Sequence, residues 1–231
     1  MKLFADFFEE FHATNNEIVE KLSDEVSTLR DRVQKLEDKL DDAAQYSRLD
    51  HVVISPKDNG GVPIYNRDEN SKSIVRNLFR EHLSLELAEN DISIAHRIGK
   101  VKMDPRTNRP MEDRRSIIVR LCRKELIGTI FAHCKNTTAP FYVNESLTPT
   151  RGKICFILRK LKKNSDKITK VRTFKGIPRA FHKSPRRNTR NSTNDVYTEI
   201  STMLQLEKFV TDHLGTTLLE LSRHPENGFS I

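Results

Sequence analysis

The sequence of 231 residues lacks a long apolar run, so we expect no transmembrane segment. The N-terminal segment, residues 1–11, is rich in apolar side chains, but Asp6, Glu9 and Glu10 interrupt it and no basic leader precedes it. We therefore expect neither a secretory signal nor membrane association. The expected location is the cytoplasm, with the nucleus as a second compartment, and matches to the Asn-x-Ser/Thr glycosylation pattern are read as chance.

Cysteine is also scarce. The three cysteines, Cys122, Cys134 and Cys155, form no C-x-x-C pair. His133 lies beside Cys134, but a zinc site needs a second such pair. The sequence therefore predicts buried, reduced thiols, with no metal and no cofactor.

Features of an enzyme are missing as well. Gly60 and Gly61 are not followed by Gly-Lys-Ser/Thr or by a helical pattern, so they do not form a phosphate-binding loop. The basic region shows no activated Ser or Cys and no cluster of carboxylates. The sequence favours a binding protein without a small-molecule substrate over a catalyst.

Positive charge is abundant and concentrated in one region. Residues 1–50 hold 7 Lys and Arg against 13 Asp and Glu, residues 51–190 hold 31 against 13, and residues 191–231 hold 2 against 6. Most of the excess falls in residues 91–190, with 26 basic and 7 acidic side chains. A footprint of this kind predicts a polyanion as partner, and single-stranded RNA or DNA is the expected class.

Residues 1–48 have the pattern of a coiled coil that makes an oligomer. Apolar side chains recur every 3.5 residues on average, at Val19, Leu22, Val26, Leu29, Val33, Leu36, Leu40 and Ala43. In a parallel homo-oligomer this register pairs opposite charges between neighbouring chains, namely Glu25 with Arg30 and Arg32 with Glu37.

Two alternatives remain open for this segment. A single amphipathic helix packed on the protein's own core is one, although its stripe is normally wider than two positions in seven. The second alternative concerns the number of helices in the coiled coil. Val at a with Leu at d favours a dimer. His12 or Asn15 at the seam can shift the register or the number of strands.

Residues 50–146 predict a compact domain of the order β-α-β-β-α-β, so the fold class is α+β. Periods of two and of 3.6 residues alternate along this stretch, giving strands at 51–56, 92–98, 116–121 and 141–143 and helices at 71–83 and 124–134. This order is the split βαβ arrangement of RNA-recognition domains.

Residues 147–231 predict a small C-terminal α/β domain. Thr148 and Pro149 are a favourable helix start, and a hairpin over 168–181, a basic linker over 184–192 and a final helix over 196–210 follow. The first of these helices places cations around an aromatic residue on one face: Lys153, Phe156, Arg159, Lys160 and Lys163. Phe156 either stacks on bases or packs against the strands that follow.

Several short motifs lie in a recognisable order: Gln45-Tyr46-Ser47-Arg48, His96-Arg97-Ile98-Gly99, Ile117-Ile118-Val119-Arg120 and Asn144-Glu145-Ser146-Leu147-Thr148. With this order and spacing the chain resembles the first-open-reading-frame protein of LINE-type retrotransposons. Its C-terminal part is similar to the C-terminal domain of the baculovirus few-polyhedra protein. The resemblance implies a trimeric coiled coil, an RNA-recognition domain and a C-terminal domain that coat RNA as a nucleic-acid chaperone. It also implies that Arg151 contributes to an RNA cleft.

The proposed binding residues follow from alternation along the strands. The aromatic residues that normally stack bases are absent from 52–54 and 117–119. If Ile92, Ile94 and Ile98 face the core, Arg97 faces solvent, and Arg120 does the same on the next strand. Further cations come from the loop between these strands: Lys100, Lys102, Arg106, Arg109, Arg114 and Arg115. The competing function is that of a coiled-coil structural or adaptor protein, of viral or domesticated cellular origin.

Overall fold

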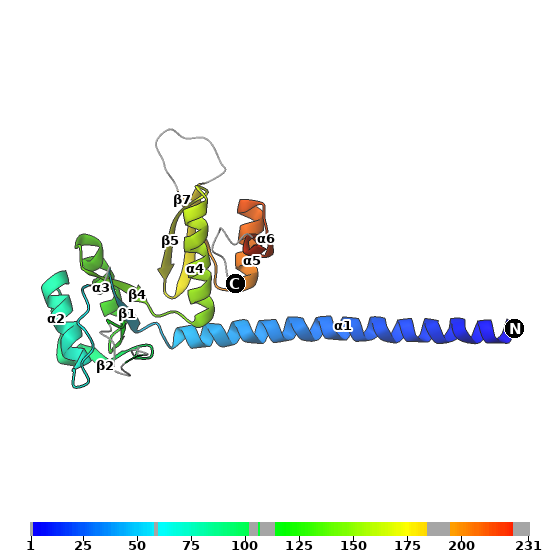
Figure 1. Cartoon of the computed structure of the whole chain (residues 1–231), viewed down its shortest axis with the longest axis horizontal. Coiled ribbons are helices and arrows are strands. Elements are labelled where there is room, and N and C mark those ends of the chain that lie inside the picture. Colours follow the sequence, from blue (N-terminus) through cyan, green and yellow to red (C-terminus); the bar gives the residue numbers. More distant parts are fainter. Residues whose placement is uncertain (1, 58–59, 102–105, 107–113, 184–194, 224–231) are drawn as a thin grey trace. The chain divides into compact units, whose positions relative to one another are not determined.

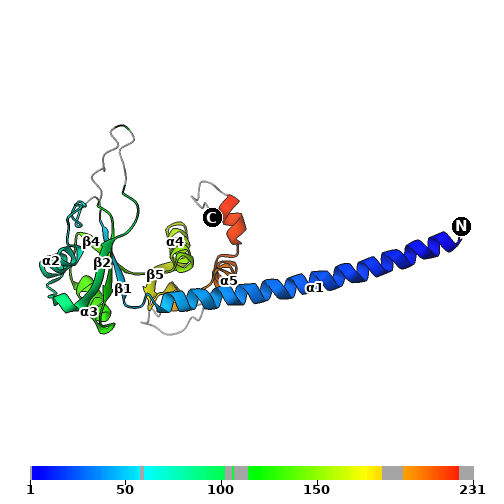
Figure 2. The ribbon, with the colours of Figure 1, turned by 90° about the horizontal axis from the view of Figure 1, so that it is seen from below.

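The computed structural model describes residues 2–57, 60–101, 106, 114–183 and 195–223. It is a mixed α+β structure that divides into two compact units, one ending at Ala44 and the next beginning at Gln45. Helix α1 (Lys2–Tyr46) is one continuous helix (Figures 1 and 2), and it has 45 residues. Its last two residues belong to the second unit. The N-terminal unit therefore ends at residue 44, four positions before the end expected from the sequence.

The heptad seam lies along an exposed stripe of α1. In the single chain its Val and Leu side chains are 44% to 71% exposed: Val19, Leu22, Val26, Leu29, Val33, Leu36 and Leu40. Lys21 and Glu17 form an ion pair one turn apart beside the stripe, with Nζ and Oε1 2.6 Å apart. The stripe has the exposure expected of a heptad seam, and the coiled coil stays a prediction.

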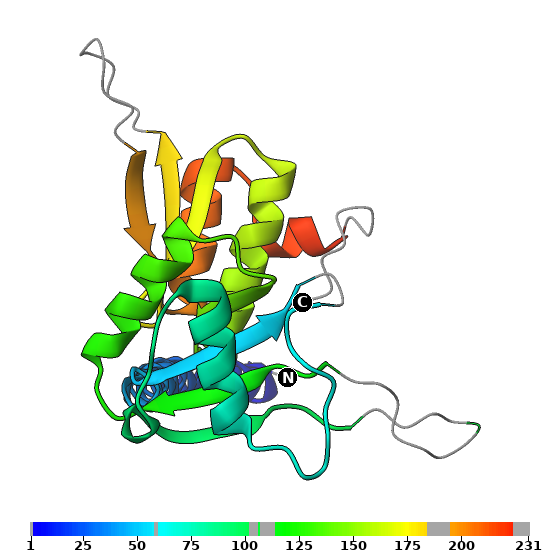
Figure 3. The ribbon, with the colours of Figure 1, turned by 90° about the vertical axis from the view of Figure 1, so that its left-hand side faces the viewer.

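The order β-α-β-β-α-β predicted for residues 50–146 is present. Its elements are β1 (His51–Pro56), α2 (Ser71–Leu83), β2 (Ile92–Arg97), β3 (Ile117–Leu121), α3 (Glu125–Asn136) and β4 (Phe141–Glu145), with a short 3-10 turn at Glu89–Asp91. The strands form one antiparallel sheet in the order β2-β3-β1-β4. Both helices cover the same face of this sheet (Figure 3). We call residues 50–146 the four-stranded region.

Local signals explain where α2 begins and ends. The Asn70 side chain accepts hydrogen bonds from the backbone N–H groups of Lys72 and Ser73, which satisfies two donors of the first turn. Ser84 takes a left-handed conformation with φ of 51° and ends the helix. Between these caps the apolar side of α2 packs against the inward residues of the sheet. The helices and the sheet share one core, which includes Val52, Ile54, Val75, Leu78, Phe79, Leu83, Ile92, Ile117, Val119, Ile130 and Phe141.

A β-bulge in β2 reverses the faces predicted by simple alternation. The pairing with β3 is Ile92 with Leu121 and Ile94 with Arg120, so one extra residue is inserted between them. Ile92 is therefore buried, whereas Ile94 is 49% exposed on the opposite face. The prediction that Ile94 lies in the core and Arg97 faces solvent is wrong for this reason.

Two matched substitutions test the bulge. Ile94→Asp should change the free energy of unfolding by about 0.5 kcal/mol or less, because the new carboxylate would lie in water. Ile92→Asp should unfold the four-stranded region, because the same carboxylate would lie in the core without a partner. Chemical denaturation of both variants measures the difference, and equal destabilisation of the two would contradict the register.

The remaining residues form a second, smaller layer of sheet and helix. Its elements are α4 (Pro149–Asn164), β5 (Ile168–Phe174), β6 (Ile177–Lys183), β7 (Asp195–Glu199), α5 (Met203–Leu214) and α6 (Leu218–Arg223). The three strands are antiparallel in the order β5-β6-β7. Their inward residues share one core with α4 and α5: Ile154, Leu158, Leu161, Ile168, Ala180, Ile200, Leu206, Phe209 and Val210. We call residues 147–223 the three-stranded region.

Helix α4 begins as predicted, but the final helix does not. The Thr148 hydroxyl accepts a hydrogen bond from the backbone of Arg151, and proline occupies the first turn. The expected helix over 196–210 is confirmed for 203–210 and wrong before that, since 195–199 form β7 and pair with β6. Thr202 then makes a capping box with Gln205, and α5 starts only at Met203. The basic linker predicted at 184–192 lies outside the described residues.

Candidate nucleic-acid interface

Arg97 is held inside the four-stranded region. Its guanidinium makes two hydrogen bonds to the Glu69 carboxylate, Nε to Oε1 at 2.8 Å and Nη2 to Oε2 at 2.9 Å, and Nη1 donates to the Arg115 carbonyl oxygen. Only 3% of the Arg97 side chain is exposed. Burial would raise the pKa of Glu69, but the hydrogen bonds from Arg97 and from the Asn66 backbone lower it below its ordinary value. Arg97 therefore has a structural role, and its buried position does not fit the predicted contact with nucleic acid.

The cations of the loop between β2 and β3 divide into two kinds. Lys100 and Arg106 are exposed. Arg114 donates to the Val62 carbonyl oxygen at 2.8 Å, and Arg115 donates to that of Gly99 at 2.9 Å. The predicted residues Lys102 and Arg109 lie outside the described residues. Two of these side chains thus hydrogen-bond to the backbone of described residues, and two others are exposed.

Arg120 is on the side of the sheet where alternation placed it. Its side chain is half exposed, and Nε donates to the Asp50 carboxylate at 3.0 Å. Burial would raise the pKa of Asp50, but the hydrogen bond from Arg120 and the charge of the neighbouring His51 lower it below its ordinary value. The guanidinium is accessible to a phosphate, although that phosphate would compete with Asp50.

The sheet face opposite the helices carries an aromatic residue that the sequence reasoning missed. Tyr142 on β4 pairs with Ser55, is 52% exposed and has the Lys57 ammonium 5.6 Å from its ring centroid. The sequence prediction considered stacking aromatic residues on the first and third strands and not on the fourth. The alternation of Phe141 inward and Tyr142 outward could have indicated it. The same face includes outward residues of all four strands: Val53, Ser55, Ile94, His96, Ile118, Arg120, Tyr142 and Asn144.

The exposed face of α4 gathers the cations predicted for it. Lys153, Arg159 and Lys163 are exposed, Lys160 is half-buried, and the Lys160 ammonium lies 4.7 Å from the centroid of the Phe156 ring. Phe156 is 54% exposed, so the alternative in which it packs against the following strands is wrong. A half-exposed ring among cations can stack on an unpaired base while the cations contact phosphates.

Arg151 differs from its neighbours on α4 because it is buried. Its Nη1 donates to the Gly176 carbonyl oxygen at 3.2 Å, and only 4% of the residue is exposed. Glu145 accepts hydrogen bonds from the backbone N–H groups of Lys175 and Gly176, both at 2.9 Å. Arg151 therefore holds the turn between β5 and β6, and the RNA contact implied for it by the resemblance does not fit this position.

Gln45 completes the same junction. Its side-chain nitrogen donates to the Ser146 carbonyl oxygen and its oxygen accepts from the Thr148 backbone N–H, both at 2.9 Å. Gly176 has φ of 74°, and a Cβ at that position would lie 2.2 Å from the Gln45 amide nitrogen. The end of α1, the start of α4 and the turn between β5 and β6 are thus fixed together, which holds the four-stranded and three-stranded regions in contact.

The three cysteines differ in their exposure. Cys155 is buried and Cys134 half-buried, and burial raises the pKa of both thiols. Cys122 is exposed, so the prediction that all the thiols are buried is wrong for this one. Within the described residues no group of His, Cys, Asp or Glu is large enough to hold a metal ion.

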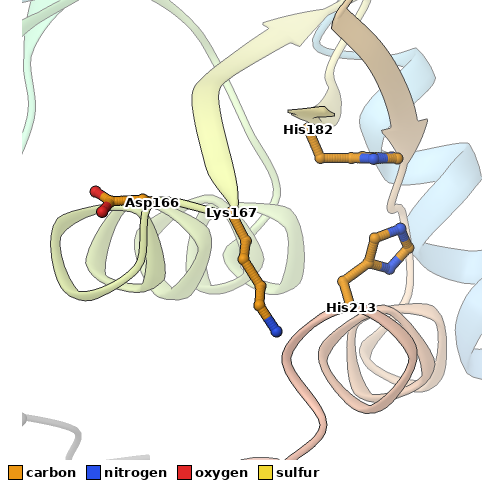
Figure 4. Close-up of a pocket in the computed structure, with 4 residues that line it drawn as sticks. All are labelled: Asp166, Lys167, His182 and His213. Carbon is orange, nitrogen blue, oxygen red and sulfur yellow. The ribbon is translucent and has the colours of Figure 1, made fainter. Parts of the chain in front are cut away.

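A pocket of about 320 Å³ in the three-stranded region is lined by Asp166, Lys167, His182 and His213 (Figure 4). His182 Nε2 lies 3.1 Å from the Thr198 hydroxyl, and His213 Nδ1 lies 3.1 Å from the Phe209 carbonyl oxygen. The Asp166 carboxylate points away from both imidazoles (Figure 4). Each imidazole thus has one nitrogen engaged by the fold, and Asp166, the carboxylate among the residues that line this pocket, does not orient the other nitrogen.

No protein-family model matches this chain, and a search of curated proteins found no significant match. In the part of the chain that the structure describes, no helix is both long enough and apolar enough to cross a membrane. The class of this protein accordingly rests on its own geometry: an α+β protein with a long N-terminal helix, two antiparallel sheets and displayed cations.

Proposed function

We propose that this protein is a non-enzymatic, self-associating protein that binds single-stranded RNA or DNA and coats it as a nucleic-acid chaperone, in a ribonucleoprotein of the retrotransposon type. Helix α4 carries the proposal. Its 16 residues include six Lys or Arg and no Asp or Glu, and of the six only Arg151 is buried. A helix face with this charge attracts phosphates independently of base sequence.

The open sheet face supports the same function. Tyr142 and Lys57 place a ring and an ammonium close together on it, and Arg120 supplies a second accessible cation. RNA-recognition domains bind unpaired bases on this side of a sheet of the same strand order, through exposed aromatic residues. Here the ring is on β4, so we expect fewer stacked bases and a larger share of phosphate contacts.

Self-association is supported by α1. The exposed Val and Leu seam repeats every 3.5 residues, and the flanking charges attract in a parallel arrangement. Val at a and Leu at d favour a dimer, whereas the resemblance to LINE proteins favours a trimer. Either assembly joins several basic units, which suits a protein that coats a strand.

Salt dependence separates this function from that of an adaptor protein. Each neutralised phosphate of a single strand contributes about −0.7 to the slope of log affinity against log salt. Six to ten contacts would give a slope of roughly −4 to −7. Fluorescence anisotropy with a labelled single strand measures it, and unrelated sequences should bind alike. An adaptor protein would show weak binding and a flat response.

Neutralising the exposed cations of α4 tests the observation on which the proposed function depends. The variant K153Q/R159Q/K163Q should make the slope less steep by about 2, since it removes three phosphate contacts. The control K72Q/K135Q/K208Q makes the same change in net charge on other helices, where Lys135 and Lys208 are exposed and Lys72 is half-buried. An equal change of slope in both variants would show that α4 is not the interface.

A further inference from the structure

The face of the three-stranded sheet that points away from α4 and α5 carries rings and cations in register. Cross-strand partners form one row of Lys170, Phe181 and Tyr197 and a second row of Arg172, Arg179 and Glu199. The residues between them, such as Val171 and Ala180, point toward the core. Phe174 follows the same alternation at the end of β5. By the same alternation Ile177, which pairs with Phe174, also lies on this face. The side chains of the two rows and of Phe174 are all aromatic or charged.

Arg179 lies between two rings on this face. Its guanidinium carbon is 4.3 Å from the ring centroid of Phe174 and 4.5 Å from that of Tyr197. Its Nε and Nη2 donate to Glu199 Oε1 at 2.9 and 2.5 Å. The Phe181 and Tyr197 ring centroids are 5.5 Å apart, which extends the aromatic row. Both rings beside Arg179 nevertheless remain about half exposed, at 48% for Phe174 and 47% for Tyr197.

The charged residues on this face indicate which class of ligand it binds. The cations around the rings are Lys170, Arg172, Lys175 and Arg179, and Glu199 is the single carboxylate in the two rows. Exposed rings offer stacking surfaces to any base, and the cations offer contacts to the phosphates on either side. An unpaired polynucleotide matches both features, whereas an acidic peptide would match the cations alone.

We propose that the outer face of β5–β7 is a base-stacking subsite for unpaired nucleotides, which Arg179 and Glu199 occupy in the free protein. A base takes the place of the guanidinium between Phe174 and Tyr197, and Arg179 turns to a phosphate. Glu199 opposes this exchange because its carboxylate holds Arg179 and repels phosphates. The subsite rests on the proposed binding of single strands and specifies where bases are read.

The first test compares two strands of equal length, oligo-dT and an abasic strand with the same phosphates. The full-length protein should bind oligo-dT more tightly. The variant F174L/Y197L should lose about tenfold or more in affinity for oligo-dT and leave the abasic strand unaffected, because it removes stacking and not charge. Tyr46→Leu is the matched control, since Tyr46 is exposed and has the Lys124 ammonium 4.7 Å from its ring centroid. It should change neither affinity.

The second test concerns Glu199. Glu199→Gln should tighten binding of oligo-dT about two- to fivefold by releasing Arg179. Glu207→Gln on α5 removes an equal charge from an exposed position of the same region and should have a smaller effect. Weaker binding by Glu199→Gln would overturn the role given to the ion pair.

Other results overturn the subsite and distinguish it from the proposed function. Equal losses for both strands in F174L/Y197L would mean that the rings only position cations. Steep salt dependence with no preference for oligo-dT would remove the subsite and leave the phosphate-coating function in place. Competition by a poly-Glu peptide as strong as that by oligo-dT would assign the face to an acidic protein. Absence of binding to either strand would contradict the proposed function itself.

Discussion

Replacing Arg97 with alanine is expected to lower the free energy of unfolding of the four-stranded region by about 3–5 kcal/mol. The guanidinium makes both of its paired hydrogen bonds to Glu69 inside the fold, and the Glu69 side chain is itself only 8% exposed. Alanine would leave that carboxylate charged, buried and without its partner. The cost comes mainly from this uncompensated charge and much less from the lost attraction.

Arg120→Ala is the matched control. It removes an arginine from the adjacent strand, but this side chain is 49% exposed and its ion pair with Asp50 lies near solvent. Its loss should cost about 1 kcal/mol or less. Urea denaturation of both variants measures the contrast, and similar midpoints would show that the ion pair of Arg97 and Glu69 contributes little.

Acid provides an independent check with a definite sign. The folded-state pKa of Glu69 is below its ordinary value of 4.5, so the pair stabilises the wild type above that pH and loses this effect as the pH falls through the folded-state pKa. In Arg97→Ala the unpaired buried carboxylate should have a raised pKa. Acidification should then raise the free energy of unfolding of the variant while it lowers that of the wild type. Parallel profiles of the free energy of unfolding against pH would contradict this.

Placing two glutamates in the seam of α1 is expected to dissociate the proposed oligomer completely at micromolar concentration. The variant L29E/L36E removes two d-position leucines, each contributing about 1.5–3 kcal/mol of burial per chain, and brings like charges together. Affinity for long single strands should fall about 100-fold or more, because linked basic units act together. Light scattering and anisotropy measure the two effects.

The control is S27E/Q34E, which adds the same charge on the outer side of α1. Ser27 and Gln34 are exposed and lie at b positions of the heptad. This variant should keep the mass and the affinity of the wild type, and the wild-type mass itself decides between dimer and trimer. An unchanged mass in L29E/L36E would show that α1 is not the source of assembly.

Periodicity predicted the helices and strands well where the apolar spacing and the capping or turn residues indicate the same element. The order from β1 to β4, the start of α4 and the hairpin of β5 and β6 all follow from spacing and caps. It failed at 196–210, where the apolar spacing suits either a helix or a strand. Pairing with β6, which no local pattern reveals, decides in favour of β7.

The candidate site was harder to predict because side-chain direction depends on long-range pairing. The single inserted residue in β2 moves Arg97 from the solvent side to the core side, and only the register with β3 exposes the shift. Arg151 was expected on the surface by analogy, yet its partner Gly176 lies 25 positions further along the chain. By contrast, the exposed face of α4 depends only on helical spacing, and it was predicted correctly.

The buried amide of Gln45 imposes an order on biosynthesis. Its two hydrogen-bond partners lie 101 and 103 positions later in the chain. At roughly 5–20 residues per second, the ribosome produces them about 5–20 s after residue 45. Helix formation in a peptide takes about a microsecond or less, so the residues around Gln45 can become helical many seconds before their partners in the junction are translated.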